Sequence, residues 1–165
     1  MANVRKYGTK LAKSFRARLP SSNKTENLEA EKIFYTSNHQ WVKIHNEEQK
    51  LATIGITDYG QDRMGCVSYI DFDTVENDKV FRGHSFVTVK SRFGHGLQEI
   101  KMPVSAKIME INKRLSEIPL MVNRAPENEG WMLNVQFDKI RDVTDLMTKQ
   151  EYEKFLEKQS RRLAN

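Results

Sequence analysis

Short hydrophobic runs, each bounded by polar or turn residues, recur along most of the chain. Apolar and polar residues alternate within many of these runs, which is typical of half-buried β-strands. The pattern predicts these strands: Ile33–Ser37, Gln40–His45, Leu51–Ile56, Val67–Phe72, Phe86–Lys90, Leu97–Met102, Val104–Ile111 and Trp131–Phe137. Strands so short and so closely spaced indicate a β-rich fold.

One short internal helix interrupts this pattern. Thr57 is a good N-cap residue for a helix over Asp58–Met64, and Gly65 is a residue type that ends helices. The stretch Leu115–Val122 contains Pro119 and is expected to be a loop with at most a short helix. The middle of the chain therefore carries little helix.

Residues 33–165 are expected to form one domain with a C-terminal helix. The chain has 165 residues, of which 38% are hydrophobic, enough for a single core. A capping box at Thr148–Glu151 predicts that the last helix begins at about Lys149. The single Cys66 excludes an intramolecular disulfide framework and a cysteine-based zinc site. No apolar run approaches the ~18 residues of a membrane-spanning helix.

Residues 1–32 are expected to be a basic extension and linker. Seven of the 27 basic residues lie in residues 1–25, where there is no acid, so 20 basic residues face 22 acids in the remainder. The net charge of +5 therefore comes from the extension, and an RNA-binding groove on the domain is disfavoured. The basic residues of the extension are Arg5, Lys6, Lys10, Lys13, Arg16, Arg18 and Lys24.

The same segment has the marks of a mitochondrial transit peptide, because basic residues without acids combine with apolar residues at near-helical spacing. A basic tail on a cytosolic protein is the alternative. We expect a mitochondrial, matrix-side protein that does not span the membrane. We also expect its extension to be retained and held by ribosomal RNA, anionic lipid or an acidic protein surface.

The predicted hairpin Phe86–Met102 ends in a tip that carries a cation, an aromatic ring and an imidazole but no lysine. Gly94 and Gly96 permit the tight reversal. Arginine beside an aromatic residue is typical of interface anchors, so the tip is a candidate partner-binding surface. One alternative is that the Phe93 ring is simply exposed to solvent or packed locally. Another is that it stacks on a nucleic-acid base, although the basic stripe that usually surrounds such a ring is missing. The candidate residues are Ser91, Arg92, Phe93 and His95.

Residues with catalytic or metal-binding chemistry are scattered along the chain. No Ser-His-Asp order, phosphate-binding glycine loop or paired carboxylates stand out, and four clustered acids are interpreted as a solvated loop. The histidines lack carboxylate or cysteine neighbours at metal-ligand spacing. The sequence therefore predicts neither an enzyme nor a metal site. The residues concerned are His39, His45, His84 and His95, and the acids Asp71, Asp73, Glu76 and Asp78.

Several separate motifs follow one another in the order and at nearly the spacing of the glycine cleavage system H protein family, which the chain resembles from about Tyr35 to Leu156. The resemblance implies an α+β, lipoyl-domain-like barrel-sandwich hybrid with a short internal helix and a C-terminal helix. The motifs are Tyr35-Thr36, His39, Trp41, Gly55–Gln61, Pro103-Val104-Ser105, Glu110-Ile111-Asn112, Val122-Asn123, Pro126 and Glu129-Gly130-Trp131.

The resemblance also implies a lipoyl group on a lysine at the hairpin tip. Alignment from Gly83 and Phe86 puts Phe93 at that position, whereas alignment backwards from Pro103 puts His95 there, because this loop is longer than is usual in the family. Neither residue can form the lipoyl amide. Two fallback lysines, Lys90 and Lys101, are expected to face outward near the base of the hairpin.

Two functions are therefore open. The first is a non-catalytic, non-lipoylated accessory subunit of a large mitochondrial assembly, either a respiratory-chain complex or the mitochondrial ribosome, with other protein subunits as partners and no cofactor. The alternative is an H-type lipoyl carrier, with lipoate as cofactor, or a regulator of glycine cleavage. Either would act with the glycine decarboxylase and the aminomethyltransferase that the resemblance implies.

Overall fold

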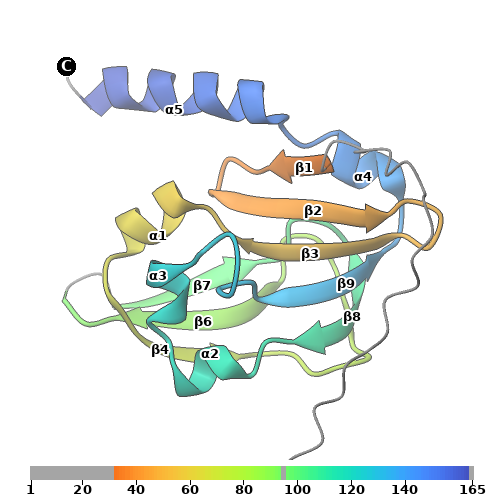
Figure 1. The fold of residues 1–165 in the computed structure, drawn as a ribbon, viewed down its shortest axis with the longest axis horizontal. Helices are drawn as coiled ribbons and strands as arrows, with labels where there is room; N and C mark the ends of the chain where they lie inside the picture. The colour runs from red at the N-terminus through yellow and green to blue at the C-terminus, as the bar shows by residue number, and fades with distance from the viewer. Residues whose placement is uncertain (1–31, 94–95, 164–165) are drawn as a thin grey trace, which may run out of the picture.

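The computed structural model describes residues 32–93 and 96–163, which form two β-sheets and a few helices (Figure 1). The larger sheet has six strands in the order β1-β2-β3-β9-β8-β5, and the smaller has the order β4-β6-β7. The strands are β1 (Lys32–Tyr35), β2 (Gln40–Asn46), β3 (Leu51–Ile56), β4 (Val67–Phe72), β5 (Lys79–Val80), β6 (Ser85–Ser91), β7 (Leu97–Lys101), β8 (Ala106–Ile111) and β9 (Leu133–Phe137). The helices are α1 (Asp58–Met64), α2 (Arg114–Glu117), α3 (Met121–Arg124), α4 (Ile140–Thr144) and α5 (Lys149–Leu163).

The two sheets enclose one main hydrophobic core. In the larger sheet, Val42 lies opposite Ile54 and Ile54 lies opposite Leu133, so three fully buried residues form one cross-strand row. Val87 and Val89 of β6 supply buried residues from the smaller sheet. Strands β2, β3 and β9 thus send alternate residues into the core, as a period of two requires. This is the lipoyl-domain-like barrel-sandwich that the resemblance implied.

Helix α1 carries the chain from the larger sheet to the smaller one. The Thr57 hydroxyl accepts a hydrogen bond from the Gly60 N–H over 3.0 Å, which caps the helix start. At the other end Gly65 has a φ of 76°, a conformation that strains most other residues. The predicted bounds of α1 and of β4 are confirmed.

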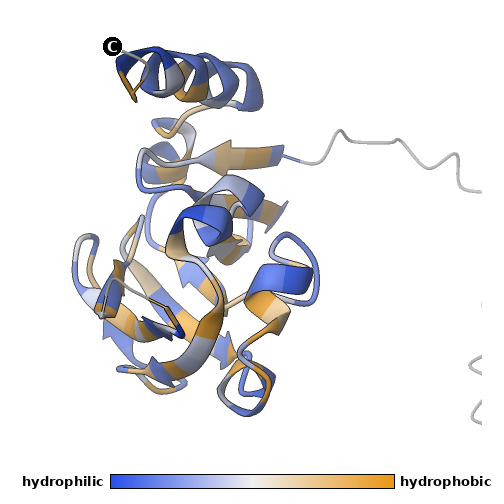
Figure 2. Ribbon diagram, turned by 90° about the vertical axis from the view of Figure 1, so that its left-hand side faces the viewer, coloured by the Kyte–Doolittle hydropathy of each residue, from blue (hydrophilic) through white to orange (hydrophobic). Residues whose placement is uncertain are grey.

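The C-terminal helix α5 lies along the outer edge of the larger sheet, beside β1 (Figure 1). The backbones of Tyr35 and Met147 form a two-way bridge just before this helix begins. Figure 2 shows that polar residues dominate α5, with few hydrophobic positions. The predicted start of the helix at Lys149 is confirmed. No helix among residues 32–93 and 96–163 is long and apolar enough to cross a membrane.

Several boundaries differ from the sequence prediction. Strand β1 ends at Tyr35 rather than Ser37, because the following turn places His39 at a φ of 60°. Strands β8 and β9 begin at Ala106 and Leu133, later than predicted. The expectation of at most one short helix in residues 115–122 is wrong, since α2 and α3 lie on either side of the proline. Strand β5 and helix α4 were not predicted, because elements so short leave no periodic pattern.

Candidate functional site: the β6–β7 hairpin

The β6–β7 hairpin carries the residues that the sequence singles out. Its pairing runs from Ser85 opposite Lys101 at the base to Lys90 opposite Leu97 near the tip. Residues 91–96 connect the two strands beyond the last pair. The hairpin therefore projects the candidate residues at one end of the three-stranded sheet.

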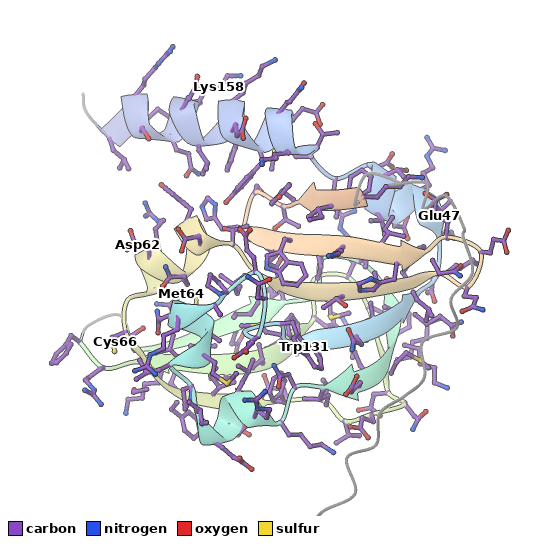
Figure 3. The ribbon with its side chains drawn as sticks, viewed as in Figure 1. Glu47, Asp62, Met64, Cys66, Trp131 and Lys158 are labelled. Carbon is purple, nitrogen blue, oxygen red and sulfur yellow. The ribbon has the colours of Figure 1, made fainter. Side chains whose placement is uncertain are left out.

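Two hydrogen bonds fasten the tip to the junction between α1 and β4. The Ser91 hydroxyl donates to the carbonyl of Met64, and the backbone N–H of Arg92 donates to the carbonyl of Cys66 over 2.8 Å. Met64 and Cys66 are labelled in Figure 3 at the end of α1 and the start of β4. Strand β6 is thus held by β4 beyond the point where its pairing with β7 stops.

Helix α3 also contacts the junction between α1 and β4, through the side chain of Asn123. The Asn123 side chain donates to the Gly65 carbonyl over 2.9 Å and to the Gln61 side chain over 2.8 Å. Its carbonyl oxygen accepts from the Val67 N–H over 2.9 Å. One side chain of α3 therefore ties the end of α1 to the start of β4.

The predicted tip residues differ in exposure. Phe93 is 80% exposed and Arg92 is also exposed, so both can meet a partner. Ser91 is only 5% exposed, and its hydroxyl holds the tip to α1 rather than facing outward. Gly94 and His95 lie outside the described residues, as does the basic extension of residues 1–31.

The structure places the two fallback lysines at opposite ends of the hairpin. Lys101 lies at the base, as expected, but Lys90 forms the last pair before the tip, so the expectation that it lies near the base is wrong. The reason is that its partner Leu97 is the first residue of β7, so only residues 91–96 separate the two. Both lysines are exposed.

The residues of the tip do not fit a covalently attached lipoyl group. Such a group needs a primary amine at the tip, and residues 91–96 contain none. Lys90 offers an amine one residue before this segment. Within the described part of the chain, no group of His, Cys, Asp or Glu side chains is arranged to hold a metal ion.

The sequence did not predict an aromatic cluster that joins the turn after β1 to helices α1 and α5. His39 packs against Tyr59, with ring centroids 4.7 Å apart, and Tyr152 stacks on Tyr35 at 4.8 Å. Burial, and then the Arg63 guanidinium, lower the pKa of His39. The apolar residues spaced along α5 were the available signal, but they do not identify the partners of the helix.

A polar cleft of about 690 Å³ lies between this cluster and the hairpin. Its lining includes His39, Arg63, Glu99 and Lys101. The turn after β1, helix α1 and strand β7 thus share one surface beside the base of the hairpin.

Comparison with known proteins agrees with this architecture. The sequence model described as "Glycine cleavage H-protein" matches residues 33–159. The chain is 37% identical over 125 residues to the mitochondrial glycine cleavage system H protein 2 of Arabidopsis thaliana, covering 76% of each chain. It is 34% identical over 121 residues to the glycine cleavage system H protein of Thermotoga maritima, covering 73% of this chain and 93% of that one.

A solved structure shows the same fold. The crystal structure of a glycine cleavage system H protein from Mycobacterium marinum superposes with a TM-score of 0.63 at 25% identity, covering 73% of this chain and 92% of that chain. The relatives thus include both mitochondrial and bacterial proteins, and the match spans nearly all of the two-sheet domain. On its fold, its motifs and these relatives, the chain belongs to the glycine cleavage H-protein family.

Proposed function

We propose that this chain is a non-catalytic, H-type binding protein of the glycine cleavage system that carries no lipoyl group at its hairpin tip. One observation carries the proposal. The hairpin is formed and its tip is hydrogen-bonded to the carbonyls of Met64 and Cys66, yet residues 91–96 contain no lysine. An amide to lipoate needs an amine, and neither Phe93 nor Arg92 supplies one. What the fold retains is a surface that can contact other proteins.

The partners in this proposal are the glycine decarboxylase and the aminomethyltransferase that members of this family are expected to meet. The H proteins of the glycine cleavage system in Arabidopsis and Thermotoga are similar to this chain over 125 and 121 residues. A chain with that surface and without the arm is suited to bind these enzymes and regulate access of the lipoylated carrier. Its location is mitochondrial, in the matrix, because of the basic acid-free extension in residues 1–25.

A carrier version of the same function rests on Lys90. Its side chain is exposed and lies one residue before the tip, so an arm attached there starts close to the usual place. This version requires a lipoyl group on Lys90. Lys101 is poorly placed for it, since it pairs with Ser85 at the base.

A second candidate function is an accessory subunit of a large mitochondrial assembly, either a respiratory-chain complex or the ribosome. The lysine-free tip and the basic extension favour it, since a structural subunit needs neither lipoate nor catalysis. The extension would then contact ribosomal RNA, anionic lipid or an acidic protein surface.

The deciding experiment is intact-mass measurement and peptide mapping of the protein isolated from its native source, together with identification of the proteins that co-purify. We expect an unmodified Lys90 and recovery of the two glycine cleavage enzymes. A lipoyl group on Lys90 would establish the carrier version. Migration with a ribosome or a respiratory complex, and without either enzyme, would contradict the proposal and favour the accessory subunit.

A further inference from the structure

One row of exposed side chains crosses all three strands of the smaller sheet next to the hairpin tip. Tyr69 of β4 lies opposite Lys90 of β6, which lies opposite Leu97 of β7. Tyr69 is 49% exposed and Leu97 is 65% exposed. The register shift after Val67 brings Tyr69 opposite Lys90, because it inserts one extra residue into β4. Side chains directly opposite one another on one face are close neighbours.

Two further exposed residues follow Lys90 and Ser91 in the chain. The Arg92 N–H donates to the carbonyl of Cys66, the residue just before β4, so Arg92 continues the alternation of the strand and shares the outer face with Lys90. Phe93 follows at 80% exposure. We call this surface the tip patch, made of Tyr69, Lys90, Arg92, Phe93 and Leu97.

The tip patch combines unpaired positive charge with exposed apolar surface. Within residues 32–93 and 96–163, the side chains of Lys90 and Arg92 make no ion pair or hydrogen bond. Phe93 and Leu97 are among the most exposed large hydrophobic residues of the domain. Apolar side chains gathered on one surface beside cations are typical of protein-binding sites.

The charge of the patch is local. The next row along the same face is Asp71, Thr88 and Glu99, so the sheet becomes acidic immediately behind the patch. An acidic partner is therefore attracted at the end of the hairpin and repelled farther along the sheet. Nucleic acid fits less well, because a phosphate backbone running onto the sheet would meet these carboxylates.

We propose that the tip patch docks end-on into an apolar recess rimmed by carboxylates on a glycine cleavage enzyme. Phe93 enters the recess, Leu97 and Tyr69 cover its edge, and Lys90 and Arg92 pair with the rim. This inference rests on the proposed function and specifies the chemistry of the partner surface.

The test measures binding of the full chain to the glycine decarboxylase and the aminomethyltransferase of the same organism, at several salt concentrations. The variants are the double change Lys90→Glu with Arg92→Glu, the single change Phe93→Ala, and the control Lys107→Glu. Lys107 is an exposed lysine on β8 of the other sheet. All of the altered side chains are exposed, and thermal melts check that each variant folds.

We expect wild-type affinity for at least one enzyme to fall as salt rises. The double variant should bind at least about tenfold more weakly with a flatter salt dependence, since two cations at the contact are reversed. Phe93→Ala should weaken binding about tenfold while keeping the salt dependence, because it removes an apolar anchor. Lys107→Glu should stay within about twofold of wild type.

Three results would overturn the inference. Tip variants that bind like wild type would remove it and leave the proposed function intact. Absence of wild-type binding to both enzymes would remove the proposed function and this inference with it. The third comes from measuring the same variants against poly(U) RNA and against vesicles of phosphatidylcholine and phosphatidylserine. A double variant that loses binding only to the RNA, or only to the vesicles, would show that the patch recognises a polyanion instead of a protein.

Discussion

The hydroxyl of Tyr152 lies 2.9 Å from Nδ1 of His39, and this contact joins the C-terminal helix to the turn between β1 and β2. The same hydroxyl lies 2.9 Å from the hydroxyl of Thr57, the N-cap of α1. Burial raises the pKa of Tyr152, which keeps its phenol neutral and able to donate. One side chain of α5 thus holds three separated segments together.

Tyr152→Phe should destabilise the domain by about 1–2 kcal/mol, because it removes both polar contacts and leaves the ring stacking intact. The measurement is urea unfolding at neutral pH. Tyr69→Phe is the matched control, since Tyr69 is half exposed and lies away from α5. A loss in the control equal to that in Tyr152→Phe would contradict the role of the buried hydroxyl.

The lowered pKa of His39 predicts a pH-dependent stability. Its ordinary value is 6.5, and the folded value is lower because of burial first and Arg63 second. Between the two values the unfolded chain binds more protons than the folded one. The contribution of His39 is therefore fully present above about pH 6.5 and is lost as the pH falls through the folded pKa.

His39→Asn tests this contribution. Asparagine tolerates the φ of 60° found at this position and carries no charge at any of these pH values. Urea unfolding between pH 8 and pH 5 should show a smaller loss of stability for the variant than for wild type. Parallel curves for the two proteins would mean that His39 titrates alike in both states.

Asn123→Ala should destabilise the domain by about 1–3 kcal/mol, because the Val67 N–H and the Gly65 carbonyl lose a partner where α1 meets β4. Hydrogen exchange of the amides of Ser91 and Arg92 should also accelerate, since the tip is fastened to this junction. Asn38→Ala, at an exposed side chain, is the control. Unchanged exchange at the tip in a destabilised Asn123 variant would separate the junction from the hairpin.

Phe93→Lys should create a lipoylation site. Incubation with a lipoate–protein ligase and lipoate should add one lipoyl group at position 93, read by intact mass and peptide mapping, whereas wild type should stay unmodified. His95→Lys tests the alternative register of the tip. Modification of the wild-type chain at Lys90, removed by Lys90→Arg, would contradict the expectation and support the carrier version.

Much of the fold followed from local signals. Alternating residues in β4, the N-cap Thr57 and Gly65 placed α1 and β4 correctly, because caps and strand periodicity depend on neighbours in the chain. The elements that were missed, β5 and α4, have no such signal. Among the described strands, β5 pairs with β8 alone, so its existence depends on a contact distant in sequence.

The end of β6 shows the same limit at the site. The pairing of Val67 with Ser91 extends β6 one residue beyond its last pair with β7. No local pattern in residues 86–102 encodes that pairing. The buried hydroxyl of Ser91 likewise depends on its contact with Met64 of α1.

The sequence by itself determined the family and the absence of a lysine from residues 91–96, because motif order and residue identity need no coordinates. Only the tertiary structure decided which side chains meet. Tyr69, Lys90 and Leu97 share one row because backbone hydrogen bonds and a register shift align three strands. His39 and Tyr152 meet because α5 packs back on the sheet edge, a contact that is stabilised by burial rather than by local preference.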